Sequence, residues 1–242
     1  MRYLILSDIH ANLQALDAVL EDAAGAGYDA ALVLGDLVGY GGNPVEAIDR
    51  TLALEPAAIV RGNHDRAAAG LDDASTFSLA ARLAIEWTAS VLGPADRDRL
   101  AALPKGPAAV AGDLLICHGA PFDEDYYILG PADGQRAMRA TSARVCLFGH
   151  THVTSLFGTR GLAIMPVVDG QVPLPPNGQI LANIGSVGQP RDGDPRAAYG
   201  ILDTDAGVLH FQRVDYDIAG AQARIREVGL PDMLADRLEY GR

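Results

Sequence analysis

A chain of 242 residues, of which 49% are apolar, is long enough and hydrophobic enough to bury a sizeable core. The net charge of −12 argues against a clamp for nucleic-acid backbones, because such proteins usually carry a basic face. No run approaches the roughly 20 apolar residues of a membrane span, and the start of the chain lacks the apolar core of an export signal. We therefore expect one domain over residues 1–242, soluble and cytoplasmic, with no membrane partner.

The first quarter of the chain alternates short apolar runs with helical patterns. Residues 3–6 predict a strand that is buried on both faces, and an amphipathic helix is expected from about 12 to 24, ending at Gly25 and Gly27. Pro44 is typical of a first helical residue. Further strands are expected at 30–34 and 57–60, and a further helix at 44–52. This alternation favours an α/β layered architecture.

The rest of the chain predicts a helical stretch over 66–104, followed by strands. Cys117 and Cys146 lie in two apolar strands, 114–117 and 145–148, and we expect both thiols to be buried and reduced. Beyond residue 154 the pattern favours a second, mostly antiparallel sheet, a surface loop over 166–178 and two final helices. The expected core stripe of the helical stretch is Ala80, Leu83, Ala84, Trp87 and Val91, the later strands are 154–158, 161–166, 179–183, 198–203 and 207–213, and the final helices are 217–228 and 231–240.

Five of the six histidines lie in or beside polar motifs that follow the predicted strands. Residues i and i+2 at a strand end point to the same side, so a pair such as Asp8 and His10 can reach one ion. The C-terminal edge of an open α/β sheet is also where ligands bind. The set predicts a metal site. The motifs are Asp8-Ile9-His10, Gly35-Asp36, Gly62-Asn63-His64-Asp65, Cys117-His118-Gly119 and Gly149-His150-Thr151-His152.

These motifs, in this order, resemble the pattern DxH, GD, GNHD, H and GHxH of the calcineurin-like metallophosphoesterases. Residues 7–13 and 183–191 are similar to the small prokaryotic branch of that superfamily, which includes phosphodiesterase-like and diadenosine-tetraphosphatase-like members. The resemblance implies a four-layer α-β-β-α sandwich of two mixed sheets flanked by helices.

The resemblance also implies a role for each motif residue. His64 would face the substrate without binding a metal, and Asp65 would orient it, so these two are the expected catalytic residues. Asp36 would bridge two metal ions. The other ligands would be Asp8, His10 and His152 for the first ion, and Asn63, His118 and His150 for the second.

Nitrogen and oxygen ligands without thiolate suit Mn²⁺, Fe or Zn²⁺ in an open site, and we expect two ions, with Mn²⁺ favoured. Such ions would attract a small phosphorylated substrate to an acidic chain. The expected reaction is attack of a metal-bridging hydroxide on phosphorus, with His64 protonating the leaving oxygen. A phosphodiester, a phosphomonoester and a dinucleoside polyphosphate, the last a nucleotide, all remain candidates.

Substrate contacts are expected from Asn12, Tyr40 and Arg191, and from a loop over residues 119–127 that contains Tyr126 and Tyr127. That loop is either a lid that stacks a base or a solvated rim, and Arg191 is either a phosphate ligand or a solvated loop residue. The run after Asp36 lacks the arginine of serine/threonine phosphatases, which disfavours a protein phosphatase. The alternative is a non-catalytic protein-binding scaffold on the same fold. A homo-oligomer, through the Trp87 helix or residues 154–166, is left open.

Overall fold

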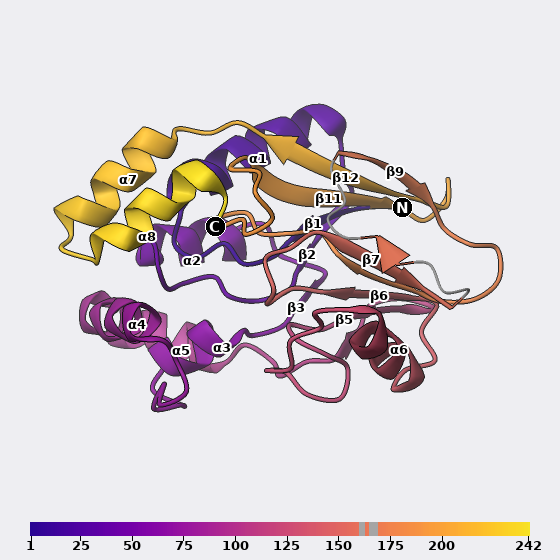
Figure 1. The fold of residues 1–242 in the computed structure, drawn as a ribbon, viewed down its shortest axis with the longest axis horizontal. Helices are drawn as coiled ribbons and strands as arrows, with labels where there is room; N and C mark the ends of the chain where they lie inside the picture. The colour runs from indigo at the N-terminus through magenta and orange to yellow at the C-terminus, as the bar shows by residue number, and fades with distance from the viewer. Residues whose placement is uncertain (160–162, 165–168) are drawn as a thin grey trace.

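The computed structural model describes residues 1–159, 163–164 and 169–242. Two mixed six-stranded sheets lie face to face with helices on their outer sides, as Figure 1 shows. This arrangement confirms the predicted α-β-β-α sandwich. Within the described residues, no helix is long and apolar enough to cross a membrane.

The first sheet has the order β3-β2-β1-β11-β12-β9. Its N-terminal strands run parallel, and β11 pairs antiparallel with β1, so that Arg2 lies opposite Asp203. The strands are β1 (Arg2–Leu6), β2 (Ala30–Val33), β3 (Ala58–Ile59), β9 (Gly170–Pro173), β11 (Ala197–Asp203) and β12 (Val208–Val214).

The second sheet has the order β4-β5-β6-β10-β7-β8. Its central strands β5, β6 and β10 run parallel, and β4, β7 and β8 add antiparallel edges. The strands are β4 (Ala108–Ala109), β5 (Leu114–Ile116), β6 (Val145–Phe148), β7 (Ser155–Gly158), β8 (Ala163–Ile164) and β10 (Ile180–Asn183).

Strand alternation divides the core into layers, because successive side chains point to opposite faces of a sheet. In β1, Ile5 packs between the two sheets, whereas Leu4 and Leu6 pack outward, in the cluster that contains α1 residues. In β6, Leu147 faces the space between the sheets, and Phe148 packs outward in the cluster that contains α6 residues. The outer helices therefore cover sheet faces that would otherwise expose apolar side chains.

Helices α1 (Leu13–Ala26), α2 (Pro44–Leu52) and α7 (Ile218–Glu227) lie on the side of the first sheet, and α6 (Pro131–Arg139) lies on the side of the second (Figure 1). Three further helices follow β3, namely α3 (Asn63–Ala68), α4 (Leu79–Val91) and α5 (Pro94–Ala101). The chain ends in α8 (Asp232–Asp236) and a 3₁₀ turn, η1 (Arg237–Tyr240). The buried Asn12 side chain caps α1 by accepting a hydrogen bond from Ala15 N.

Several expectations about the second half of the chain are wrong. The later strands do not form a separate antiparallel sheet, because β9, β11 and β12 extend the first sheet while β7, β8 and β10 extend the second. The predicted loop over 166–178 contains β9, which pairs with the edge of β12. Of the predicted strand 161–166 only residues 163–164 are described, and the others lie outside the described residues. Helix α6 was not predicted.

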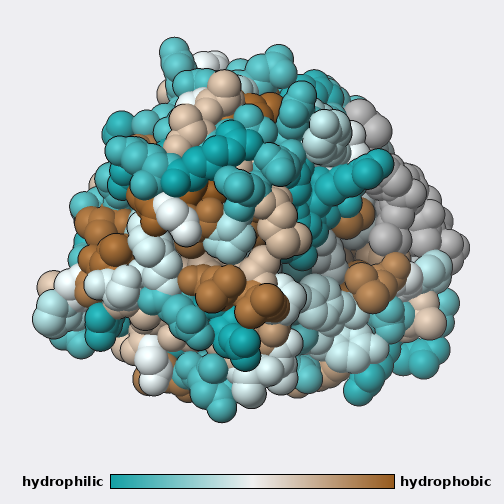
Figure 2. All heavy atoms as spheres, turned by 60° about the vertical axis from the view of Figure 1, so that its left-hand side comes forward, coloured by the Kyte–Doolittle hydropathy of each residue, from teal (hydrophilic) through white to brown (hydrophobic). Residues whose placement is uncertain are grey.

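The predicted core stripe of α4 is also partly wrong. Leu83 is 42% exposed and Val91 is 44% exposed, whereas Ala81, Ile85 and Thr88 are buried. The buried face is rotated relative to the apolar stripe because the helices packed against α4, such as α3, cover that face. On the face that carries α4, α7 and α8, exposed apolar groups are interspersed with polar ones, as Figure 2 shows. The cysteine prediction is confirmed: both thiols are free and buried.

Candidate metal centre and substrate cavity

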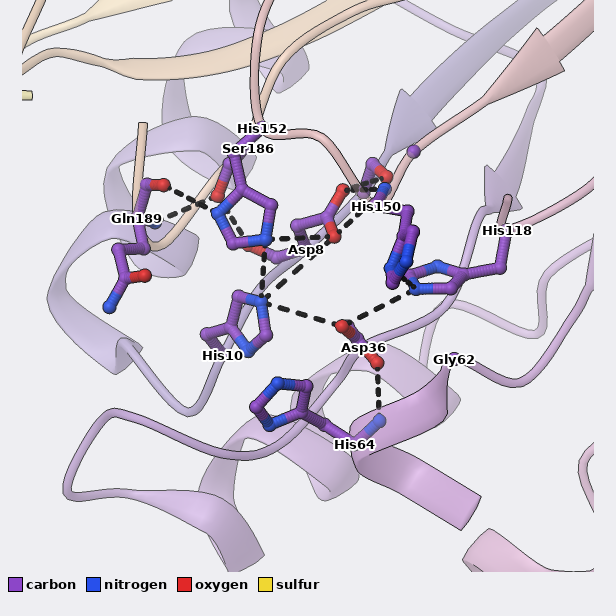
Figure 3. Close-up of polar contacts among 12 residues, drawn as sticks. Asp8, His10, Asp36, Gly62, His64, His118, His150, His152, Ser186 and Gln189 are labelled. Carbon is purple, nitrogen blue, oxygen red and sulfur yellow. Dashed lines mark hydrogen bonds and ion pairs between the residues drawn. The ribbon is translucent and has the colours of Figure 1, made fainter. Parts of the chain in front are cut away.

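The polar motifs meet at one edge of the sandwich because they follow strands that end there. Asp8 and His10 follow β1, Asp36 follows β2 and Asn63 begins α3 directly after β3. From the second sheet, His118 follows β5, and His150 and His152 follow β6. Figure 3 shows the carboxylates and imidazoles of this set pointing toward one another from both sheets. The carboxylates and imidazoles of this cluster are at most 4% exposed.

The backbone at this edge is strained. Five site residues adopt positive φ: Asp8 (53°), His10 (49°), Asp36 (55°), His150 (68°) and His152 (58°). Non-glycine residues rarely occupy this region, and each such residue costs on the order of 1–3 kcal/mol. The surrounding sheets therefore impose the side-chain directions of these residues, as expected where geometry serves function.

Two motif glycines are required by close approach. A Cβ at Gly62 would lie 1.9 Å from Asp36 Oδ1, and a Cβ at Gly149 would lie 2.2 Å from Ser7 Oγ and 2.7 Å from Asp8 Oδ2. Any side chain at either position would push a site carboxylate aside. The glycines of the GNHD and GHxH patterns thus make room for the carboxylates.

The first group of donors consists of Asp8, His10, Asp36 and His152, whose ligand atoms all lie within 4.8 Å of one another. The Nε2 atoms of His10 and His152 are 3.0 Å apart. His152 Nε2 lies 3.2 Å from Asp8 Oδ1, and His10 Nε2 lies 3.6 Å from Asp36 Oδ2. Two carboxylates and two imidazoles therefore surround one small volume.

The second group consists of Asp36, His118 and His150. His118 Nε2 lies 3.1 Å from His150 Nδ1 and 3.4 Å from Asp36 Oδ2. The side-chain oxygen of Asn63 lies 3.1 Å from the same His118 Nε2 and adds a fourth donor. Asp36 is the one residue that the two groups share.

Each of the four histidines places one ring nitrogen beside a backbone carbonyl. His10 Nδ1 is 3.0 Å from Val38 O, and His152 Nδ1 is 2.7 Å from Gln189 O. A carbonyl only accepts, so these nitrogens carry the protons and the Nε2 lone pairs point inward. Burial lowers the pKa of both His10 and His152, which keeps the two rings neutral. Two lone pairs therefore face each other at 3.0 Å, an arrangement that a cation between them would stabilise.

In the second pair, His118 and His150, one ring nitrogen also lies beside a backbone carbonyl, but in His150 this nitrogen is Nε2 and not Nδ1. His118 Nδ1 lies 2.8 Å from Leu34 O, whereas in His150 it is Nε2 that lies 3.2 Å from a carbonyl, that of Asp125. Nε2 of His118 and Nδ1 of His150 consequently point at the site. The two pairs thus have the lone-pair directions that metal ligation requires.

Asp36 carries the strongest sign of a shared cation. Its Oδ1 accepts the hydrogen bond of His64 N at 2.9 Å. Its Oδ2 is buried and has no hydrogen-bond partner among the described residues, although it lies between the imidazoles of both groups. Burial raises the pKa of Asp36, but the facing imidazoles, His118 foremost, lower it well below its usual value. The carboxylate is therefore ionised and fits an ion on either side.

The electrostatics of His118 agree with this fit. Burial lowers the pKa of His118, but the charge of Asp36 outweighs burial and raises the pKa to about 10. A proton on His118 thus occupies the place where a cation would lie. Burial and the charge on His118 lower the pKa of His150 to about 3, so that ring stays neutral. The donor set therefore carries more negative charge than its one protonated imidazole neutralises, and it attracts a cation.

His64 lies beside the metal-binding groups but belongs to neither of them. Its ring packs against His10, Tyr40 and Phe77 with centroids 4.5–4.8 Å apart. Its Nδ1 is buried and has no hydrogen-bond partner among the described residues. Burial lowers the pKa of His64 to about 4. The ring also lines the cavity next to the metal-binding groups.

Asp65 supports His64 through the backbone and not through the ring. Its Oδ1 accepts from Leu37 N at 2.8 Å and from Val38 N at 3.2 Å, and its Oδ2 accepts from Gly62 N at 3.0 Å. Burial and the charge of Asp36 raise the pKa of Asp65 to about 7. Asp65 therefore ties the turn after β2 to the start of α3, where His64 lies.

A cavity of about 520 Å³ opens onto the donor groups. Tyr40, Tyr127 and Arg191, three of the residues expected to contact substrate, line it. Asn12 and Tyr126 do not line it. The amide of Asn12 donates to Gly188 O at 2.9 Å, and the hydroxyl of Tyr126 donates to Asp133 at 2.8 Å. Both side chains bond within the protein, so we leave them out of the candidate substrate site.

Sequence reasoning missed one wall of the cavity. Thr76, Phe77 and Ser78 line it from the segment before α4, and Arg66 lines it from α3. Asp125 joins them from the 119–127 loop, which was predicted to lie at the site. The segment before α4 is short and polar, with Phe77 as its single aromatic residue, and helical spacing gave no sign that it would turn back over His64. Only its position in the sequence could have indicated Arg66, because it lies two residues after His64 on the same helix.

Fold and site together define an α/β protein with two groups of side chains that could bind metal, and comparison with known proteins identifies the family. Residues 1–207 match the family model of the calcineurin-like phosphoesterase superfamily domain. The chain belongs to this superfamily, as the motif pattern predicted.

Relatives and solved structures agree over almost the whole chain. A metallophosphoesterase from Sphaerobacter thermophilus is 39% identical, with a TM-score of 0.90 over 100% of this chain and 99% of that one. The uncharacterized protein MJ0912 of Methanocaldococcus jannaschii is 33% identical over 98% of this chain and 97% of its own length. The hypothetical protein PH1004 of Pyrococcus horikoshii OT3 shares the fold at 22% identity, with a TM-score of 0.80 over 100% and 98% of the two chains.

Proposed function

We propose that this protein is a dinuclear metal-dependent hydrolase of small phosphate esters. The observation that carries the proposal is the unpartnered Oδ2 atom of Asp36, which lies between the imidazoles of two donor groups. A carboxylate in this position can bridge two ions about 3.5–4 Å apart. Membership in the phosphoesterase superfamily supports phosphate esters as the substrate class.

The residues that would hold the ions are those of the two groups. Asp8, His10 and His152 would bind the first ion, Asn63, His118 and His150 would bind the second, and Asp36 would bind both. Nitrogen and oxygen donors without thiolate suit Mn²⁺, Fe or Zn²⁺, and we favour Mn²⁺. When bound, two such ions would activate a water molecule for attack on phosphorus and neutralise the phosphate oxygens.

His64 is the proposed general acid. Its ring lines the cavity, lies 4.8 Å from the ring of His10 and is free of the metal-binding groups, so it can reach the leaving oxygen of an ester bound at the ions. Burial keeps the ring neutral in the free protein, and an anionic phosphate beside it would raise its pKa and favour the protonated form. Asp65 would hold the ring in place through the α3 backbone.

The cavity suggests how the organic part of the ester is bound. Its volume of about 520 Å³ is far larger than a phosphate group and falls within the range of small-molecule sites. Arg191 lines it with a buried Nε that has no partner among the described residues, and its guanidinium lies 5.5 Å from the centre of the Tyr40 ring. Tyr40, Phe77 and Tyr127 add aromatic surface. We assign Arg191 to phosphate oxygens and the aromatic rings to the ester substituent.

Phosphodiesters, phosphomonoesters and dinucleoside polyphosphates all fit this description. The non-catalytic scaffold is less favoured, because a scaffold has no need of seven converging donors and a free histidine in a cavity. The cytoplasmic location and the oligomeric state stay predictions.

A substrate panel tests the proposal directly. The purified protein, freed of metal and reconstituted with Mn²⁺, is assayed with bis-aryl phosphate, mono-aryl phosphate, a cyclic nucleotide, diadenosine tetraphosphate and a phosphopeptide. We expect hydrolysis of at least one small ester and none without metal. Equal rates with and without metal, or no hydrolysis of any ester, would contradict the proposal.

A pair of histidine variants tests the general acid. His64→Asn is expected to retain both ions and to lose about 10²–10⁴-fold in kcat, most severely for poor leaving groups. His210→Asn is the matched control, because His210 lies on β12 outside both donor groups, and it should keep full activity. Full activity of metal-loaded His64→Asn would remove the assigned role.

A further inference from the structure

The four imidazoles of the metal centre are not supported equally. The carbonyls that accept from His10, His118 and His152 belong to Val38, Leu34 and Gln189, and all three residues are buried. The carbonyl that accepts from His150 belongs to Asp125, whose side chain is 46% exposed and which lies in the 119–127 loop. An exposed loop does not fix a carbonyl unless other contacts hold it.

Arg66 supplies those contacts. Its Nη1 donates to Glu124 Oε1 at 2.8 Å and to Asp125 Oδ1 at 3.2 Å, and its Nη2 donates to Asp125 Oδ2 at 2.8 Å. Its Nε and Nη2 also bond Asp72, at 3.1 Å and 2.8 Å. The Arg66 side chain is only 14% exposed. One guanidinium thus holds three carboxylates, two of them in the 119–127 loop.

The position of Arg66 connects the two sides of the second donor group. It lies on α3, three residues after Asn63, which is itself a donor of that group. From there it reaches the loop that carries the carbonyl bonded to His150. Arg61 reinforces the link, because it donates to both oxygens of Glu124 at 3.1 Å and 3.0 Å. The helix that begins with Asn63 and the loop that bonds His150 are therefore joined by one network of charge-assisted hydrogen bonds.

Contacts within the 119–127 loop connect the residues bonded by Arg66 to the residues that contact His150. Ala120 and Asp123 exchange backbone hydrogen bonds of 2.8 Å and 3.1 Å. A Cβ at Gly119 would lie 2.6 Å from Glu124 O, so the loop closes tightly on its own start. At its other end, the ring of Tyr127 stacks on the ring of His150 with centroids 3.8 Å apart. His150 is thus held by the hydrogen bond that its Nε2 donates to Asp125 O and by the Tyr127 ring on one face.

We propose that Arg66 is a positioning residue for the second metal site: it fixes the 119–127 loop so that Asp125 O holds His150 with Nδ1 directed at the ion. This inference rests on the proposed function only in so far as the centre binds two ions. Arg66 lines the cavity, but all three of its donor nitrogens already bond carboxylates. The planar fork matters, since a lysine ammonium cannot hold three carboxylates in this geometry.

A calorimetric titration of the metal-free protein with Mn²⁺ alone tests the proposal. We expect wild type to bind two ions in two steps. Arg66→Met is expected to weaken one step by about 10–100-fold, as is typical for the loss of a group that orients a ligand, and to leave the other step within about threefold. Arg66→Lys should give a smaller loss in the same step.

The matched control is Arg99→Met. Arg99 also bonds two carboxylates, Asp49 and Asp96, but on α5 and outside the cavity, so both steps should be unchanged. Two unchanged steps in Arg66→Met, or two steps weakened equally, would overturn the proposal. If Arg66→Met does not fold, Asp125→Asn keeps the carbonyl and the side-chain volume while weakening the clamp. It should weaken the same single step, and its failure to do so overturns the proposal equally.

Activity separates this role from substrate binding. At saturating Mn²⁺, Arg66→Met should regain kcat with an unchanged KM, because excess metal compensates for a weak site. A KM that stays raised at saturating Mn²⁺ would instead make Arg66 a substrate ligand and contradict the proposal. Wild type that binds two ions but hydrolyses no ester would contradict the proposed function alone.

Discussion

The two halves of the proposed metal centre differ in charge and in support. The first half contains Asp8 in addition to the shared Asp36, and its imidazoles bond the carbonyls of buried residues. Ser186 also bonds Asp8 O and Gln189 N, which ties the first half to the loop after β10 (Figure 3). The second half has Asn63 where the first has a carboxylate, and its His150 depends on the 119–127 loop.

The difference between the halves lies in the contacts that fix their side chains, and we expect the geometry of the first half to be the less sensitive to substitutions outside the core. The first half takes its geometry from strand ends and buried turns, so it forms whenever the sandwich forms. The second half takes part of its geometry from ion pairs between Arg66 and an exposed loop. We therefore expect changes outside the core to act on the second half and to spare the first.

The largest loss of metal binding and activity should follow from removing the charge of Asp36, because both halves share this residue. Asp36→Asn keeps an oxygen for His64 N but removes the shared charge, so both ions should be lost or greatly weakened. We expect hydrolysis to fall by about 10⁴-fold or more, since metal ions contribute several kcal/mol of charge stabilisation and each 1.4 kcal/mol is tenfold. Metal analysis after dialysis, alongside the rate, checks this. A variant that keeps two ions and wild-type turnover would show that Asp36 does not bridge.

A second prediction concerns graded metal removal. The ion in the second half should leave first as chelator is added, because this half lacks the charge of Asp8. One extra charge at 4 Å is worth about 1–4 kcal/mol for effective dielectric constants of 80 to 20, so the two dissociation constants should differ about fivefold or more. Calorimetry with Mn²⁺ measures both constants. Two equal constants would contradict the comparison of the halves.

A third prediction uses pH to probe the 119–127 loop. Burial raises the pKa of Glu124, but Arg61, Arg66 and Lys105 outweigh it, and the net pKa lies below the ordinary value of 4.5. A depressed carboxylate pKa stabilises the fold above the unfolded value, and this stability is lost as pH falls through the folded value.

Glu124→Gln should therefore lower the stability of the metal-free protein by about 1 kcal/mol at pH 7, and the difference from wild type should shrink below pH 4.5. Thermal unfolding across this pH range measures the difference. Glu21→Gln, which removes an exposed carboxylate on α1, is the control for general effects. A Glu124 difference that grows toward acid pH would contradict the assignment.

The smallest effect should distinguish the two neighbouring tyrosines. Tyr127 is 47% exposed, lines the cavity and stacks on His150, whereas Tyr126 bonds Asp133 outside the cavity. Tyr127→Ala should raise KM for aryl esters by about 3- to 10-fold, since an aromatic contact is worth about 0.5–1.5 kcal/mol. Tyr126→Phe should leave KM within about twofold. Equal changes in KM for the two variants would remove Tyr127 from the substrate site.

The sequence predicted that the side chains of the first half would come together, but it predicted hardly anything of what supports the second half. Strand ends and i, i+2 spacing place Asp8, His10, Asp36 and His152 by local rules that hold wherever parallel strands end together. The hydrogen bonds of Arg66 to Glu124 and Asp125 join residues 58 and 59 positions apart in the sequence. Hydrophobic periodicity does not predict such a contact between charged side chains.

The errors in the fold have a similar origin. Most of the strands from β7 to β12 were visible as short apolar runs, whereas β9 lay in the predicted loop. Their division between two sheets depends on long-range pairing, such as Tyr3 with Leu202 and Leu181 with Phe157. Local patterns favour a strand without naming its neighbour. The buried face of α4 was misplaced for the same reason, because helices packed against it decide which side chains are covered.

The central claim is that two ions share Asp36. The most direct test is a titration of the metal-free protein with Mn²⁺, monitored by low-temperature electron paramagnetic resonance. Ions bridged at about 3.5–4 Å interact magnetically. The account predicts binding of two equivalents, with the signal of an isolated ion replaced by that of a coupled pair as the second equivalent binds. Saturation at one equivalent, or two equivalents whose signals simply add, would contradict it.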